Sequence, residues 1–287
     1  MWIAITLLCA FFFATSDALS KAALRKTPPL ALAFARYATS AAFMSVFLFR
    51  SAPPPHPGEY LGWFALALPL EICAIVLYMK ALSRSPLSLT VPFLALTPVA
   101  VIFVGWLFLG ERPRAAGMGG VALVAAGAYV LALRKNAAGL LDPFRTLSRE
   151  PGSLMMMAVA LLYSVTATAG KKMVLLSSPF FMASSYSLVL AAALAVALFV
   201  RQGGKIFPGI FRRPILWAIG LSETGHALTH VTAITLAPAA YMIAVKRTAL
   251  FFGVLYGVFL FKEGSASFRL AGSLVMLAGV FVLAFAK

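Results

Sequence analysis

Ten apolar segments divide this sequence, and each is close to the length that a helix needs to cross a lipid bilayer. A membrane helix uses roughly 20 mostly apolar residues to span about 30 Å of hydrocarbon. The segments cover approximately residues 2–20, 29–49, 60–82, 87–109, 115–133, 153–171, 179–200, 214–236, 238–261 and 266–286. No connection between them is long enough to form a soluble domain. The sequence therefore predicts an all-α integral membrane protein with ten transmembrane helices.

The composition argues against the common soluble classes. Hydrophobic residues make up 62% of the chain and charged residues only 11%, whereas soluble domains carry about 25% charged residues. Cys9 and Cys73 both lie inside apolar segments, so no disulfide framework is expected. The sequence carries no nucleotide-binding P-loop and no hydrolase or zinc-enzyme motif with usable spacing. We therefore expect neither an enzyme nor a cofactor.

The net charge of +16 is first of all a topology signal. Fourteen of the 24 Lys and Arg residues fall in or beside the connections after segments 1, 3, 5, 7 and 9. Lys and Arg are enriched in cytoplasmic loops, so this side is predicted to face the cytoplasm and both termini to lie outside. Because these basic residues lie at membrane ends, nucleic-acid binding is not expected.

The chain contains an internal repeat. Residues 71–134 align without gaps onto residues 223–286, with eleven identities in 64 positions. The aligned pairs include Glu71 with Glu223, Pro86 with Pro238, Gly105 with Gly257, Glu111 with Glu263, Gly120 with Gly272, and Gly127 with Gly279. We interpret residues 1–134 and 152–287 as two five-helix repeats joined by a linker at 135–151. Five is odd, so the second repeat enters the membrane from the opposite side, as in inverted-repeat transporters.

Three sequence stretches resemble one transporter family. They are "WLFLGERP" (106–113), "VFLFKEGS" (258–265) and "YMKALSRSPLSLTVPFLALTPV" (78–99). Together with the duplicated five-helix unit, they are similar to EamA-domain transporters of the drug/metabolite transporter superfamily. The resemblance implies secondary transport of a small polar metabolite by alternating access, in a bacterial inner (plasma) membrane. Relatives export amino acids, sugar phosphates, nucleotide-sugars and drugs. The chain could act as a monomer, and the sequence leaves oligomers open.

Ionisable residues inside the apolar segments are the candidate functional residues, because each costs at least about 2.5 kcal/mol at mid-membrane. Lys246 and Arg247 lie near the middle of the ninth segment, and their repeat counterparts are Leu94 and Ala95. A guanidinium fork and a compact ammonium suit phosphate or carboxylate. The stretch "AVKRTALFF" (244–252) is also similar to the Lys-Arg pair of triose-phosphate/phosphate translocators, where the pair holds substrate phosphate. The alternative is an internal ion pair with Glu223, Glu71 or Asp17.

The remaining candidates divide into two groups. Arg36, Lys80, Tyr78 and Tyr163 join Lys246 and Arg247 as candidate substrate-binding residues, and the candidates for coupling or ion pairing are Glu71, Glu223, His226, His230 and Asp17. Arg36 either lines a cavity or pairs with Asp17 or Glu71. Lys80 lies near the end of its segment, where its stem can reach the headgroups. Asp17 and Lys21 are one turn apart and are expected to form a local ion pair.

Glu223, His226 and His230 share one face of the eighth segment. These three residues could either carry protons during transport or form a hydrogen-bonded cluster between helices. Glu-x-x-His can form half of a carboxylate metal site, but the second such motif is missing, so no metal is expected.

Two further features concern the helix ends and hinges. Pro92 and Pro98 interrupt the fourth segment, whereas their repeat counterparts in the ninth are Ala244 and Leu250, so the two segments do not share this hinge chemistry. Glu111 follows the end of the fourth segment and is expected to have a structural role.

The function predicted from the sequence is secondary transport, export or exchange, of a small organic anion or phosphorylated metabolite. One alternative is an amino-acid or related metabolite exporter of the EamA type. A further alternative is a lipid-phosphate flippase, whose cavity would open laterally to the bilayer.

Overall fold

The computed structural model describes residues 1–85, 91–132, 151–202, 209, 211–260 and 266–285, and every regular element within these ranges is a helix. The predicted linker at 135–151, apart from Pro151, lies outside the described residues, as do Pro86 and Glu263 of the repeat alignment.

The helices follow the ten predicted segments. Residues 1–132 form α1 (Trp2–Ala23), α2 (Pro29–Arg50), α3 (Pro57–Arg84), the 3-10 helix η1 (Val91–Ala95), α5 (Leu96–Leu109) and α6 (Ala115–Ala132). Residues 151–285 form α8 (Pro151–Leu175), α9 (Pro179–Gln202), α11 (Pro214–Thr235), α12 (Ala239–Lys246), α13 (Ala249–Phe259) and α14 (Ala266–Phe285). The fourth and ninth segments are thus each divided into two helical pieces.

The lengths and composition of the helices fit a membrane protein. Within the described ranges, α1, α2, α3, α8 and α9 are each long and apolar enough to cross a bilayer. Large apolar side chains cover the outside of the bundle, among them Phe103, Leu107, Val200 and Phe281, which are all more than 60% exposed. Water-soluble surfaces seldom expose apolar patches of this extent, whereas lipid stabilises them.

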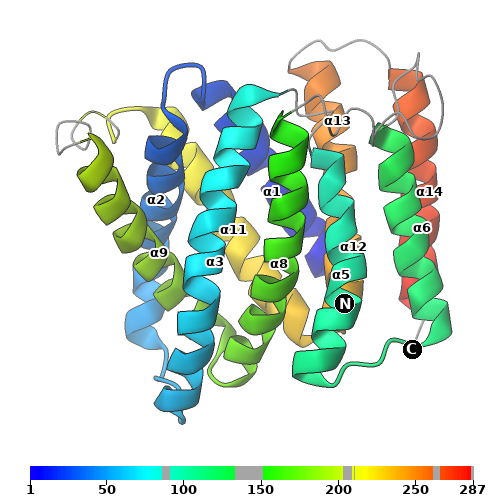
Figure 1. Ribbon diagram of the computed structural model, residues 1–287, viewed down its shortest axis with the longest axis horizontal. Coiled ribbons are helices and arrows are strands. Elements are labelled where there is room, and N and C mark those ends of the chain that lie inside the picture. The colour runs from blue at the N-terminus through cyan, green and yellow to red at the C-terminus, as the bar shows by residue number, and fades with distance from the viewer. Residues whose placement is uncertain (86–90, 133–150, 203–208, 210, 261–265, 286–287) are drawn as a thin grey trace.

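The helices lie side by side in one bundle (Figure 1). In the view of Figure 1, α9, α2 and α3 occupy one end and α6 and α14 the other, with α1, α8 and α11 between them. The principal helix pairs are α1 with α11, α3 with α8, α2 with α9, and α6 with α14. Each of these pairs joins a helix from residues 1–132 to one from residues 151–285.

Glycines let α6 and α14 approach closely. A Cβ atom built on Gly127 would lie 2.5 Å from the backbone nitrogen of Met276, and one built on Gly279 would lie 2.7 Å from that of Val124. Small residues at membrane helix interfaces permit this kind of backbone contact. The two contacts are equivalent under the sequence repeat, since residues 124 and 127 align with 276 and 279.

Candidate functional site

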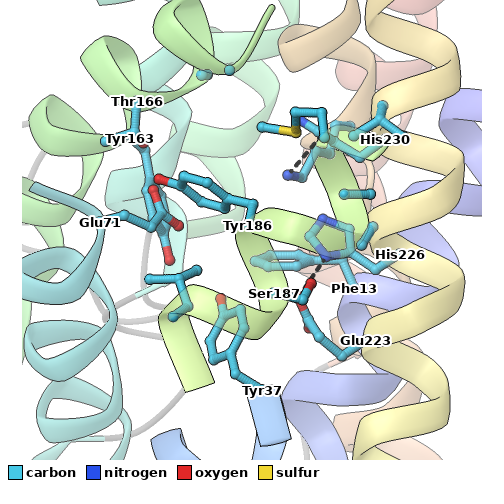
Figure 2. A pocket seen from close by; sticks show the side chains of 18 of the residues that line it. Phe13, Tyr37, Glu71, Tyr163, Thr166, Tyr186, Ser187, Glu223, His226 and His230 are labelled. Atoms are coloured by element: carbon cyan, nitrogen blue, oxygen red, sulfur yellow. Dashed lines mark hydrogen bonds and ion pairs between the residues drawn. The ribbon is translucent and has the colours of Figure 1, made fainter. Parts of the chain in front are cut away.

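A cavity of about 140 Å³ lies in the middle of the bundle, with roughly ten times the space that one water molecule needs. Its charged and histidine side chains are Arg36, Glu71, Glu223, His226, His230, Lys246 and Arg247. Its other polar side chains are Tyr37, Thr97, Tyr163, Thr166, Tyr186 and Ser187. Figure 2 shows Glu71, Tyr163 and Thr166 on one side of the cavity and Glu223, His226 and His230 on the other.

A break in the ninth segment places Lys246 and Arg247 at the cavity. Lys246 is the last residue of α12, and α13 begins at Ala249. Through the break, hydrogen bonds span three residues: Arg247 N to Ala244 O at 2.9 Å and Thr248 N to Val245 O at 3.0 Å. Broken helices of this kind occur in membranes where they line a cavity inside the protein. The carbonyl end of α12 also favours a cation beside it.

The first turn of α12 is held by a charged contact with Glu111, which follows α5. Gly110 adopts a left-handed conformation (φ 68°) after α5, and the chain then turns so that Glu111 reaches α12. The Oε2 atom of Glu111 accepts a hydrogen bond from Ala239 N at 2.8 Å, and its Oε1 atom lies 2.5 Å from Lys171 Nζ. Lys171 also donates to the carbonyl of Ala237 at 2.6 Å. The structural role expected for Glu111 is thus to cap α12.

A buried ion-pair network crosses the wall of the cavity. Arg36 Nη1 lies 3.1 Å from Asp17 Oδ1, and Arg36 Nη2 lies 2.5 Å from Glu223 Oε2. The hydroxyl of Tyr78 donates to the second oxygen of Asp17. Glu223 Oε1 is 3.1 Å from Nδ1 of His226. One guanidinium therefore contacts two carboxylates, and the network ties α1, α2, α3 and α11 together.

Lys246 and Arg247 stand outside this network. Lys246 Nζ is 3.4 Å from Nδ1 of His230 and 5.0 Å from the centre of the Phe13 ring. Among the described residues, neither cation has an ion-pair partner, and Arg247 Nε is buried without a hydrogen-bond partner. The strut interpretation of the pair, with Glu223, Glu71 or Asp17 as partner, has no contact in the described structure to support it.

Glu71 is the third cavity charge without an ion pair among the described residues. Its repeat counterpart Glu223 is paired with Arg36. The two glutamates thus occupy equivalent sequence positions but have different electrostatic surroundings.

Unpartnered polar atoms are concentrated at this cavity. Thr97 Oγ1, His226 Nε2 and Arg247 Nε are buried, have no hydrogen-bond partner within the described structure, and belong to cavity-lining residues. Most buried polar atoms in proteins are hydrogen-bonded. These atoms are therefore available to a bound solute.

The structure brings most, not all, of the predicted site residues together. Arg36, Tyr163, Glu71, Glu223, His226, His230, Lys246 and Arg247 line the cavity. Lys80 and Tyr78 are not among its lining residues, and Tyr78 instead contacts Asp17. Asp17 pairs with Arg36 rather than forming the expected ion pair with Lys21, whose ammonium donates to the carbonyls of Leu82 and Ser85.

Sequence reasoning did not select several lining residues. Tyr37, Tyr186, Thr166 and Phe13 are ordinary residues for membrane helices, and only their side of the helix places them in the cavity. The one available signal is spacing, because Thr166 lies three residues after Tyr163 on the same helix face.

Comparison with known proteins finds a family match over part of the chain. Residues 1–133 match the EamA-like transporter family. No curated protein matches the chain. A solved structure titled "Crystal structure of protein" superposes over 97% of this chain and 96% of that chain, with a TM-score of 0.72 and 18% sequence identity. At that identity the likeness concerns the fold alone.

The family match and the apolar helices together indicate a membrane transporter of the drug/metabolite type. The matched residues end before Lys246 and Arg247, so the family match does not include this pair.

Proposed function

We propose that the chain is a secondary transporter that moves a small organic anion, phosphorylated or carboxylated, through the central cavity by alternating access. Lys246 and Arg247 carry the proposal. They are adjacent cations at a helix break, they line the cavity, and no described acid pairs with them. Two such charges repel each other, and an anion between them removes that repulsion.

Transport by two inverted five-helix repeats is supported by the pseudo-symmetric contacts. The α1–α11 contact has its counterpart in the α3–α8 contact, and α2–α9 and α6–α14 join equivalent helices. Gly127 contacts Met276, and its repeat counterpart Gly279 contacts Val124, the counterpart of Met276. A twofold axis between the repeats requires such reciprocal contacts. The breaks support it as well, since α5 begins at Leu96, whose repeat counterpart is Thr248, within the break between α12 and α13. Transporters with inverted repeats bind substrate between discontinuous helices near the midplane.

The chemistry of the pair selects an anion. Arg247 offers a planar fork of donors that matches a carboxylate or phosphate, and Lys246 offers a compact charge. Neither residue is required by the packing of the repeat, because Leu94 and Ala95 occupy the equivalent positions. Burying each of these charges in the membrane costs free energy, and a bound anionic substrate offsets part of that cost.

The amino-acid exporter remains a second candidate because of Glu71. This carboxylate lies in the same cavity without an ion-pair partner among the described residues. An amino acid could place its carboxylate on Lys246 and Arg247 and its ammonium on Glu71. The anion is preferred because, among the described residues, the two unpaired cations are adjacent in the chain and can bind one anionic group together, whereas Glu71 is a single unpaired acid.

The test is counterflow in proteoliposomes. Purified protein is reconstituted with internal inorganic phosphate and offered labelled organic phosphates, carboxylates or amino acids. We expect exchange of anions, and a loss of at least about tenfold in the Lys246→Met/Arg247→Met variant, because truncating a buried charged contact costs about 2–5 kcal/mol. Lys80→Met is the matched control, since Lys80 does not line the cavity.

Three outcomes would contradict this assignment. Equal exchange by the double variant and the wild type would remove the pair from the site. Uptake confined to amino acids would favour the exporter, and movement of a labelled lipid phosphate without uptake of soluble anions would favour the flippase. Misfolding of the double variant is judged by thermal unfolding; removing two unpaired buried charges should leave the melting temperature equal or higher.

A further inference from the structure

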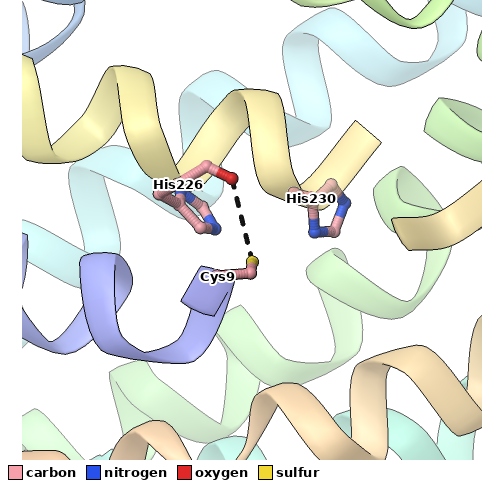
Figure 3. A group of neighbouring side chains, drawn as sticks. All are labelled: Cys9, His226 and His230. Carbon is pink, nitrogen blue, oxygen red and sulfur yellow. Dashed lines mark hydrogen bonds between the residues drawn. The ribbon is translucent and has the colours of Figure 1, made fainter. Parts of the chain in front are cut away.

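Cys9, His226 and His230 form a cluster of potential metal ligands beside the cavity, which the two histidines line. Cys9 belongs to α1, and the two histidines lie one turn apart on α11 (Figure 3). One ligand atom from each residue lies within 4.8 Å of the other two. Around a tetrahedral ion with bonds of about 2.0–2.3 Å, such atoms are roughly 3.5 Å apart. Small side-chain rotations would bring the three ligand atoms to these shorter separations.

The surroundings of His226 prepare it to bind a metal. Its Nδ1 atom is 3.1 Å from Glu223 Oε1, and an ionised carboxylate only accepts hydrogen bonds, so the Nδ1 atom carries the proton. The Nε2 atom then holds a lone pair, and this atom is buried without a partner among the described residues. A carboxylate behind a histidine that presents its other nitrogen to the ion is the usual second-shell arrangement of metal sites.

The other two ligands make contacts that a metal ion can displace. Cys9 is fully buried, and its Sγ atom lies 3.7 Å from the carbonyl oxygen of His226, a weak contact that a metal bond can replace. His230 Nδ1 faces the ammonium of Lys246 at 3.4 Å. If His230 binds the ion through that nitrogen, the flexible Lys246 side chain must swing its ammonium into the adjacent cavity.

Packing of the repeat does not require these residues. The counterparts of His226 and His230 in α3 are Ala74 and Tyr78, and the counterpart of Cys9 in α8 is Ala160. The α1–α11 contact therefore brings three soft or borderline ligands together, whereas the equivalent α3–α8 contact does not carry these residues.

We propose that Cys9, His226 and His230 bind a borderline-soft divalent cation of the Zn²⁺ type, with a fourth position open to the cavity. One thiolate and two neutral imidazoles are a ligand set that Zn²⁺ favours, and hard cations such as Mg²⁺ do not use it. On binding, the Cys9 thiol releases its proton to solvent, and the thiolate sulfur and the two imidazole nitrogens donate lone pairs to the ion. No electron transfer is involved.

The consequence for transport follows from the position of the site. The ion joins α1 to α11, which belong to different proposed repeats, and alternating access requires these repeats to move against each other. Bound Zn²⁺ therefore holds one conformation and slows exchange. This consequence rests on the proposed transport function, whereas metal binding itself does not.

Metal binding is tested on the purified, reduced protein in detergent, with Zn²⁺ measured by calorimetry and Co²⁺ by its thiolate-to-metal charge-transfer absorption. We expect one ion per chain, and at least tenfold weaker binding in Cys9→Ser, His226→Gln and His230→Gln. The chain supplies matched controls, because its other cysteine and its other histidine are the exposed Cys73 and His56. Cys73→Ser and His56→Gln should bind as the wild type does.

Two results would overturn the site. One is wild-type affinity in Cys9→Ser together with no charge-transfer band in the wild type. The other is loss of binding in the Cys73 or His56 variants instead. Because Cys9→Ser changes one atom, a monodisperse variant with an unchanged melting temperature excludes misfolding as the cause of lost binding.

Zn²⁺ added to the counterflow assay gives the second readout. We expect exchange to slow in wild type and to be insensitive in Cys9→Ser. Inhibition that persists in Cys9→Ser would overturn the conformational consequence, and an absence of all exchange would contradict the transport proposal while leaving the binding result intact.

Discussion

Arg36 of α2 lies 2.5 Å from Glu223 of α11, between Nη2 and Oε2, and the same guanidinium contacts Asp17 of α1. All three side chains are at least 94% buried. The ion pair therefore joins the two proposed repeats at the cavity wall, away from water. Buried charges of this kind depend on each other, because removal of one partner leaves the others uncompensated.

Arg36→Met should destabilise the protein by about 3–5 kcal/mol, since it leaves Asp17 and Glu223 as two buried carboxylates without a counter-ion. Thermal or denaturant unfolding in a fixed detergent measures the change. The neutral triple variant Asp17→Asn/Arg36→Met/Glu223→Gln should recover most of that loss, because replacing a whole buried ion network is often nearly neutral. Equal stability of Arg36→Met and wild type would contradict the network.

Lys171→Met should lower both stability and exchange. Lys171 holds the carboxylate that caps α12, at 2.5 Å, and also bonds the Ala237 carbonyl. Its loss leaves Glu111 without its cation and loosens the helix whose last residue is Lys246, at an expected cost of about 1–3 kcal/mol. The neighbouring Lys172→Met is the control. Lys172 is partly exposed, and its Nζ atom makes a long contact of 3.5 Å with Oε1 of the exposed Glu59. This substitution should change stability by less than about 0.5 kcal/mol.

Gly127→Val should disrupt the α6–α14 contact. A Cβ at this position would lie 2.5 Å from the backbone nitrogen of Met276, so one of the two helices must move. We expect a loss of at least about 2 kcal/mol in unfolding free energy. Gly119→Val on the same helix is the control, because no atom lies within 4 Å of its built Cβ. Equal effects of the two substitutions would argue against close packing at Gly127.

The sequence predicted the positions of the helices well, and the physical reason is simple. Lipid requires long apolar segments with internal backbone hydrogen bonds, and that requirement is visible in composition alone. Each of the ten apolar segments contains helix where the structure describes it, and the ninth is interrupted only at Arg247 and Thr248. The break at Arg247 has no such signal, because neither proline nor glycine lies between Ala239 and Phe252.

Contacts between distant helices were harder to predict than the helices themselves. Asp17 is one turn from Lys21, so the local pairing rule selected the wrong partner, whereas Arg36 approaches Asp17 from the next helix. Cys9 lies 217 residues from His226, and no periodic pattern relates the two. Lys80 was selected because it is charged, yet it does not line the cavity.

Glu71→Gln separates the two substrate classes. If the substrate is an anion alone, removal of this negative charge from the cavity wall should leave exchange within about threefold of wild type or strengthen binding, because the carboxylate repels the substrate. If the substrate is an amino acid, loss of the group facing its ammonium should weaken exchange at least tenfold.

The control for Glu71→Gln lies on the same helix. Glu59 is half exposed and lies 3.5 Å from Lys172, so Glu59→Gln changes an acid of α3 outside the cavity. Counterflow of labelled phosphates and amino acids is measured for both variants. We expect both to retain anion exchange, because Lys246 and Arg247 remain. A folded Glu71→Gln protein that has lost anion exchange would show instead that the carboxylate takes part in the anion cycle, and our assignment of substrate binding to the two cations alone would be wrong.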